Sequence, residues 1–286
     1  MSDKNTVQDH GQTKSAHPAG QYLLQADDPP PVTVLRENSP SPFVLASDHA
    51  GRAIPGRLGD LGVGIADLGR HIAWDIGIAG TGLRLSEALE APLVAQSYSR
   101  LVIDCNRRPG HPSSIPQASD GTAIPANRDM PALQRGAREA EIFAPYHACL
   151  AGLLERRLML GLPTVLVALH SFTPQLGRPD RPAPGGTAPR PWHVGLLHNH
   201  DPRFALILRD LLRDEGDLVV GDNEPYQLSD EDDYTVPVHG ERRGLPQVEI
   251  EIRQDLIGDA AGEAAWAARF ARLLPLAWAR YRQDNP

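Results

Sequence analysis

Short apolar runs of strand length alternate with stretches of helical length through most of this 286-residue chain. Gly, Pro or polar clusters bound each run, as is typical of strands in a buried sheet. Because strands and helices alternate, the sequence predicts an α/β fold, a three-layer sandwich with a mixed, largely buried sheet flanked by helices. The strand candidates are residues 42–47, 91–96, 100–105, 164–170, 192–198, 218–223 and 247–253.

Helical periodicity marks several segments between these strands. Apolar residues recur at helical spacing over 65–77, which predicts a helix with His71 and Asp75 one turn apart on a shared face. Residues 131–160 predict a helix that breaks or kinks at Pro145. Further helices are expected over 201–216 and at 258–283, the latter with Trp266, Phe270, Leu273 and Leu274 facing inward.

A single catalytic domain is the expected organisation. Residues 1–31 are polar and lack apolar periodicity, which predicts a flexible N-terminal tail. Residues 32–286 then form one domain of ordinary size. Two segments rich in Pro and Gly, 107–129 and 174–190, are expected to be long loops, and the second is interpreted as a surface loop rather than a lid.

Composition restricts the class of partner. The formal net charge of −8 argues against nucleic acid, because phosphate binding needs a basic face. No run has the length of a membrane span, and the first residues lack the apolar core of a signal peptide. Cys105 and Cys149 suit reduced thiols rather than a disulfide framework. The sequence predicts a cytoplasmic protein that acts on a small molecule, and it leaves the oligomeric state open.

Residues suited to zinc catalysis lie at or near the ends of three predicted strands. His49 follows one strand, His170 ends another, and Glu251 lies within the last. A catalytic zinc takes three protein ligands and keeps a fourth position for water beside a general base. The histidines therefore predict a site for one zinc ion. Glu251 is the predicted base, because a carboxylate in such a strand must be paired or used, and a salt bridge to Arg253 is the alternative.

The third ligand is open between several residues. Asp75 is favoured, since its face of the expected helix can pack beneath the loop that carries His49. His71, one turn earlier, is a second candidate, and Asp75 then orients a ligand histidine instead. Asp48 is adjacent to His49, but neighbouring strand residues point to opposite faces.

Two basic segments predict contacts with an anionic substrate. Asp104, Asn106 and Arg107 lie where a predicted strand passes into a loop, and Arg binds carboxylates through two parallel hydrogen bonds. The segment 238–246 offers Arg242 as a second contact, with a solvated charged loop as the alternative interpretation. An acidic substrate is therefore expected.

Several of these stretches together resemble the N-formylglutamate amidohydrolase family, which is similar in plan to the carboxypeptidase-type zinc peptidases. The similarity spans roughly residues 42–257. The matching stretches are the SDHAG..IP run at 47–55, HIAWD at 71–75, SRLVIDCNR at 99–107, LHSFTP at 169–174, NEPY at 223–226, DYTVPVHGERRGLP at 233–246 and VEIEIRQD at 248–255.

The resemblance implies roles for individual residues. In the peptidase plan, the two zinc-binding histidines correspond to His49 and His170. The Glu-x-Arg motif of the last strand, which includes the catalytic glutamate, corresponds to Glu251 and Arg253. The motif of Asp104, Asn106 and Arg107 holds a substrate carboxylate, and Ser171, which follows His170, is expected to contact the substrate as well.

Two departures from the pattern stand out. The peptidases have a ligand glutamate where this chain has Arg52, so Asp75 is expected to replace it. Deformylases of histidine catabolism carry an Asp where this chain has His71. The resemblance implies zinc-dependent hydrolysis of N-formyl-L-glutamate to formate and L-glutamate. The alternatives are a related zinc hydrolase for another N-acyl amino acid or small peptide, and a non-catalytic binder of an acidic metabolite.

Overall fold

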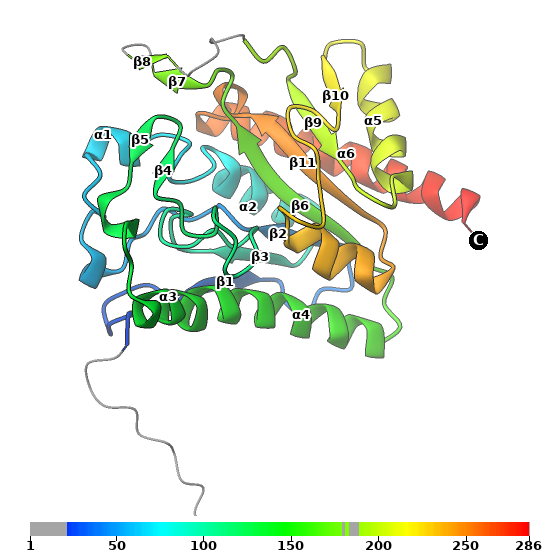
Figure 1. Cartoon of the computed structure of the whole chain (residues 1–286). Coiled ribbons are helices and arrows are strands. Elements are labelled where there is room, and N and C mark those ends of the chain that lie inside the picture. Colours follow the sequence, from blue (N-terminus) through cyan, green and yellow to red (C-terminus); the bar gives the residue numbers. More distant parts are fainter. Residues whose placement is uncertain (1–21, 179–180, 183–188, 286) are drawn as a thin grey trace, which may run out of the picture.

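A seven-stranded mixed sheet runs through the molecule (Figure 1). The computed structural model describes residues 22–178, 181–182 and 189–285. Strand β1 pairs antiparallel with β3, and β11 pairs antiparallel with β9, whereas all other neighbours are parallel. The predicted α/β class is confirmed. In spatial order the strands are β1 (Val32–Leu35), β3 (Leu93–Gln96), β2 (Phe43–Ser47), β6 (Val165–Phe172), β11 (Gln247–Arg253), β9 (Val194–Leu197) and β10 (Val220–Asp222).

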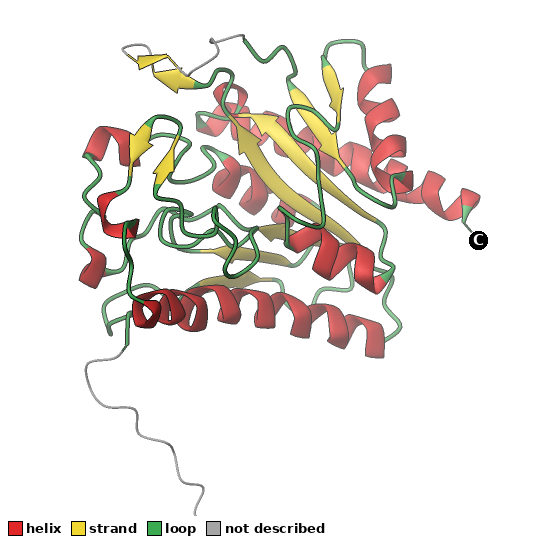
Figure 2. Ribbon diagram, in the orientation of Figure 1, coloured by secondary structure: helices red, strands yellow, loops and turns green. Residues whose placement is uncertain are grey.

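Helices cover both faces of this sheet (Figure 2). Successive strand residues point to opposite faces, so Val167 and Leu169 of β6 pack with one helical layer and Leu166 with the other. The first layer holds α2 (Ile78–Ala88), α5 (Arg203–Asp214) and α6 (Ala260–Asp284), and the second holds α3 (Ala132–Arg138) and α4 (Ala144–Met159). The inward residues predicted for α6, Trp266, Phe270, Leu273 and Leu274, are all buried.

The prediction of a strand at 100–105 is wrong. Residues 101–105 are buried but form a loop, and side chains donate to the carbonyls of Leu101, Val102 and Cys105. Asn127 Nδ2 donates to Leu101 O at 2.8 Å, and Arg138 Nη1 donates to Val102 O at 2.7 Å. The apolar run reflects burial alone, and distant polar side chains replace the ladder that a strand needs.

The helix predicted over 65–77 is also wrong in extent. Helix α1 (Ile65–Leu68) is a single turn, and no helix is assigned again until α2 begins at Ile78. Gly77, at φ 79°, lies in the left-handed region directly before α2. Asp75 therefore belongs to a turn, in which its backbone N donates to His49 O at 3.0 Å.

The irregularity predicted at Pro145 takes the form of a π-helical turn, Glu139–Phe143, that connects α3 to α4. Pro145 itself lies just after this turn, near the start of α4, and the helix continues from α3 into α4 without a gap.

The expected N-terminal tail lies outside the described residues up to residue 21. From Tyr22 onward the chain contacts the domain: the backbone N atoms of Leu23 and Leu24 donate to the Glu141 carboxylate at 2.7 and 2.8 Å.

Each expected loop carries a short two-stranded sheet. In the first loop β4 (Ala118–Ser119) pairs with β5 (Thr122–Ala123), and in the second β7 (Gly177–Arg178) pairs with β8 (Arg181–Pro182). Residues 179–180 and 183–188 of the second loop lie outside the described residues. Within the described residues, no helix combines the length and apolarity needed to cross a membrane.

Candidate metal centre and active site

A cavity of about 600 Å³ lies where the parallel strands β2, β6 and β11 end. His49 follows β2, His170 lies in the second half of β6, and Glu251 lies opposite His170 in β11. All three line the cavity. The carboxyl ends of parallel strands are a common position for ligand sites in α/β sheets, because rigid strands hold the side chains and the adjoining loops leave space.

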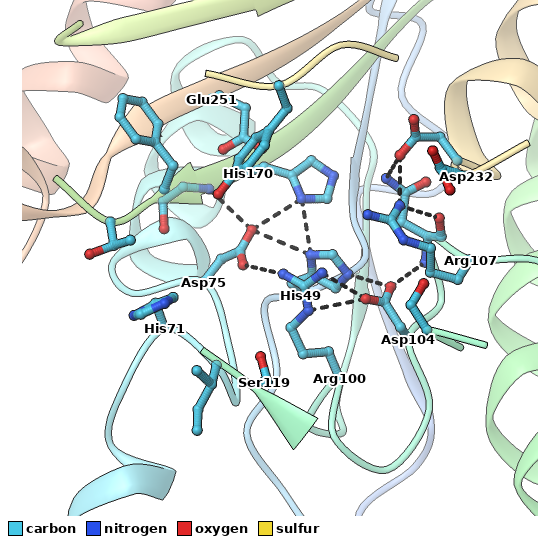
Figure 3. A pocket seen from close by; sticks show the side chains of 18 of the residues that line it. His49, His71, Asp75, Arg100, Asp104, Arg107, Ser119, His170, Asp232 and Glu251 are labelled. Carbon is cyan, nitrogen blue, oxygen red and sulfur yellow. Dashed lines mark hydrogen bonds and ion pairs between the residues drawn. The ribbon is translucent and has the colours of Figure 1, made fainter. Parts of the chain in front are cut away.

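Three ligand-type atoms converge in this cavity (Figure 3). His170 Nδ1 lies 3.1 Å from His49 Nδ1 and 3.0 Å from Asp75 Oδ2, while His49 Nδ1 lies 3.5 Å from the same carboxylate oxygen. Each of the three residues is at most 2% exposed. The structure therefore brings Asp75 together with the two histidines, although a turn rather than a helix carries it.

The spacing of these atoms fits a zinc ion. Ligands about 2.0–2.1 Å from a tetrahedral zinc lie roughly 3.4 Å from one another. The three observed separations, 3.0, 3.1 and 3.5 Å, bracket that value. Two imidazoles and one carboxylate are also a ligand set that catalytic zinc sites use.

The orientation of His49 is fixed by a carboxylate behind it. His49 Nε2 lies 2.7 Å from Asp104 Oδ1, so Nε2 carries the hydrogen and Nδ1 presents its lone pair to the cavity. Arg100 binds Asp104 through Nε and Nη2 at 3.1 and 2.7 Å. Burial raises the pKa of Asp104, but Arg100 and His49 outweigh it and hold that pKa well below its usual range.

His170 meets two further carboxylates on its other side. Its Nε2 lies 3.4 Å from Asp48 Oδ2 and 3.9 Å from Glu249 Oε2. Asp48 also accepts a hydrogen bond from Thr235 Oγ1 at 2.8 Å. Asp48 thus points away from the three converging ligand atoms, as the strand alternation predicts, and lies behind His170.

Glu249 and Glu251 project from β11 on the same side. Their neighbours Val248, Ile250 and Ile252 belong to the apolar core on the opposite face. Burial raises the pKa of each glutamate to about 8, against the lowering effect of His170. A carboxyl group that titrates near neutrality in a cavity is suited to proton transfer.

Arg107 presents part of its guanidinium to the cavity. Its Nη1 is held by Asp233 at 2.7 Å and by the carbonyl of Asn106 at 2.9 Å. Among the described residues, no hydrogen-bond acceptor meets its Nε or Nη2, so these donors are available to a ligand. Asn106 accepts from the backbone N of Tyr234 and of Thr235, both at 3.0 Å, and anchors this loop.

The remaining predicted residues lie in different places. Ser171 lines the cavity, donates from Oγ to Ile76 O at 2.9 Å, and holds Asp75 Oδ2 through its backbone N at 3.1 Å. His71 also lines the cavity but lies 3.3 Å from Asp120, and burial lowers its pKa to about 4. Arg242 is exposed and is not among the residues that line the cavity.

Sequence reasoning missed Arg100 and Tyr226. Arg100 lies between two site carboxylates, bound to Asp104 and 3.5 Å from Asp75. A basic residue four positions before Asp104, inside the SRLVIDCNR stretch, was the available signal. Tyr226 lines the cavity from the NEPY segment, which matched the family pattern without being assigned a role.

Comparisons with known proteins agree with this geometry. A family model described as N-formylglutamate amidohydrolase matches residues 41–258. A solved gene product from Agrobacterium tumefaciens is 34% identical, with a TM-score of 0.84, over 91% of this chain and 99% of that one. An N-formylglutamate amidohydrolase from Ralstonia eutropha is similar in fold, at 21% identity and a TM-score of 0.60, over 88% of this chain and 99% of that one.

None of the curated proteins matches the sequence. The family model covers well over half of the chain, including His49, His170 and Glu251. The chain therefore belongs to the N-formylglutamate amidohydrolase family.

Proposed function

We propose that this amidohydrolase depends on one zinc ion and cleaves the N-formyl or another N-acyl amide of an acidic amino acid, with N-formyl-L-glutamate as the leading substrate. The products are then formate and L-glutamate. The observation that carries the proposal is the convergence of two histidine Nδ1 atoms and the Asp75 carboxylate in a cavity that also presents Glu251 and Arg107.

His49, Asp75 and His170 are the proposed zinc ligands, and the remaining space of the cavity is available to water and substrate. A zinc ion bound there lowers the pKa of water and polarises the acyl carbonyl. Asp104 supports this arrangement, because it keeps Nδ1 of His49 free of hydrogen.

Glu251 is the proposed general base and acid. It takes a proton from the attacking water and gives it to the amide nitrogen as the bond between the acyl carbon and nitrogen breaks. Burial raises the pKa of Glu251 to about 8, which suits a group that both accepts and releases a proton near neutral pH.

Arg107 is proposed to bind the α-carboxylate of the amino acid, with Asn106 adding the one Nδ2 hydrogen that is not directed at Asp233. The unused Nε and Nη2 donors of Arg107 offer a planar pair that matches a carboxylate. The ion pair with Asp233 holds the guanidinium in place before the substrate arrives, so less rotational freedom is lost on binding. Ser171 contributes by lining the cavity beside the zinc ligands.

The decisive substitution is Glu251→Gln, which keeps the shape of the side chain and removes its proton transfer. We expect kcat for N-formyl-L-glutamate to fall about 10²–10⁴-fold with an unchanged zinc content. Glu155→Gln on the exposed face of α4 serves as the control. Near-normal turnover of the Glu251→Gln protein at full zinc occupancy contradicts the assignment, and loss of turnover only in Glu249→Gln moves the role to Glu249.

A further inference from the structure

Among the described residues, the arginines that line the cavity offer unused donors to one carboxylate. Arg100 is committed, because its Nε and Nη2 bind Asp104 and its Nη1 lies 3.5 Å from Asp75. Arg107 has one free pair of donors. An acidic amino acid has two carboxylates, and the cavity lining is itself rich in carboxyl groups. These lining carboxylates are Asp75, Asp104, Asp120, Asp232, Asp233, Glu249 and Glu251.

A third arginine, Arg190, lies beside the cavity at the end of the 174–190 segment. Its Nη1 donates to Tyr226 Oη at 2.9 Å and to Thr173 O at 3.3 Å. The guanidinium carbon lies 4.9 Å from the centre of the Tyr226 ring and 5.9 Å from that of Phe172. Phe172, Thr173 and Tyr226 line the cavity, whereas Arg190 is not among the lining residues and lies at the cavity rim, against these three.

The backbone of Arg190 is anchored on both sides. Its N donates to Pro174 O at 2.8 Å, and its O accepts from Arg253 Nη1 at 3.4 Å. This places a guanidinium in a fixed position even though it follows a long loop.

Arg190 differs in its partners from Arg100 and Arg107, each of which pairs with a carboxylate. Arg203, Arg209 and Arg269 each pair with a carboxylate. In the part of the chain that the structure describes, no carboxylate lies within ion-pair distance of Arg190, and no acceptor meets its Nε or Nη2. A guanidinium stacked on aromatic rings still directs its edge donors outward, where they can bind a carboxylate.

We propose that Arg190 binds the side-chain carboxylate of the substrate and so determines specificity for acidic over neutral amino acids. The inference rests on the proposed function, in which Arg107 binds the α-carboxylate. Each carboxylate of a dianionic substrate then meets one arginine with free donors. The neutral hydroxyl of Tyr226 orients Arg190 without competing for its charge.

The test compares N-formyl-L-glutamate with N-formyl-L-glutamine, which differ only in the charge of the side chain. We expect Arg190→Ala to lower kcat/KM for the glutamate substrate about 10–100-fold, mainly through KM, as the loss of a charge-assisted hydrogen-bonding pair implies. Turnover of the glutamine substrate should change less than about 3-fold. Arg190→Lys should recover part of the preference, since it keeps the charge and loses the paired donors.

Arg108→Ala is the matched control, because Arg108 is half-buried, does not line the cavity, and its Nε donates to the carbonyl of Asp230 rather than to groups beside Tyr226. If Arg190→Ala leaves the ratio of kcat/KM for the glutamate and glutamine substrates unchanged, including by lowering both equally, the inference is overturned. Calorimetric binding of the products L-glutamate and L-glutamine repeats the comparison without turnover. If the wild-type protein hydrolyses neither formyl substrate, the proposed function fails, while a binding preference for L-glutamate that Arg190→Ala abolishes still supports the role of Arg190.

Discussion

At the scale of single residues, the site depends on side chains that orient one another. Arg100 fixes Asp104, and Asp104 fixes the tautomer of His49. His49 and Asp104 are buried and Arg100 is half-buried, so the contact between His49 and Asp104 is made at low dielectric, where it is stronger than at the surface. The residues behind the proposed ligands are therefore expected to influence zinc affinity without contacting the ion.

Asp104→Asn tests this influence. The amide keeps the size of the side chain but can present its NH₂ group to His49 Nε2. Nε2 then accepts a hydrogen bond, and the hydrogen of the ring moves to Nδ1, the atom proposed to bind zinc. We expect zinc affinity to fall about 10–100-fold, as measured by competition with a chromophoric chelator. Asp232→Asn, which removes a carboxylate that is largely exposed at the cavity rim, should leave the affinity unchanged. Equal affinities for wild type and Asp104→Asn contradict the orienting role.

The sequence could predict some site residues and not others, for a physical reason. The sequence could predict His49, His170 and Glu251, because each lies in or just after a strand whose apolar pattern is visible locally. Arg100 acquires its role only when the chain folds and places Asp75 beside it. Asp75 was selected for its place on a helix face, but a turn held by the His49 carbonyl is what brings it to the site.

At the scale of elements, strands that pack on both faces were predictable and buried loops were not. The segments β2, β6 and β11 lie within or next to the runs that predict them. Residues 101–105 are equally apolar and equally buried, but their hydrogen bonds go to Asn127 and Arg138, far away in sequence. Local hydrophobicity reports burial, and hydrogen-bond partners decide whether a buried segment is a strand.

The turn that carries Asp75 depends on Gly77. This residue has a φ of 79°, and an added Cβ would lie 1.9 Å from the carbonyl oxygen of Ile257. We expect Gly77→Ala to lower the free energy of unfolding by at least about 2 kcal/mol in urea denaturation. Gly64→Ala is the control, since a Cβ there meets nothing within 4 Å and its φ is −63°. Equal stability of the two variants is incompatible with a strained turn at Gly77.

At the scale of the whole molecule, the sheet topology determines where the chemistry occurs. Strands β2, β6 and β11 run parallel, so their carboxyl ends meet at one edge and bring together residues that are up to two hundred positions apart. The resemblance noted in the sequence and the family match cover nearly the same part of the chain, residues 41–258 in the latter. The shared fold thus explains the position of the site.

Formate release from N-formyl-L-glutamate by protein freed of metal with a chelator decides whether the reaction depends on zinc. We expect the stripped protein to be inactive and one equivalent of zinc per chain to restore its turnover. We expect no such recovery for His170→Ala, which removes one of the three converging ligand atoms. Full activity of the stripped wild-type protein, with no metal detected, is incompatible with the proposed zinc dependence.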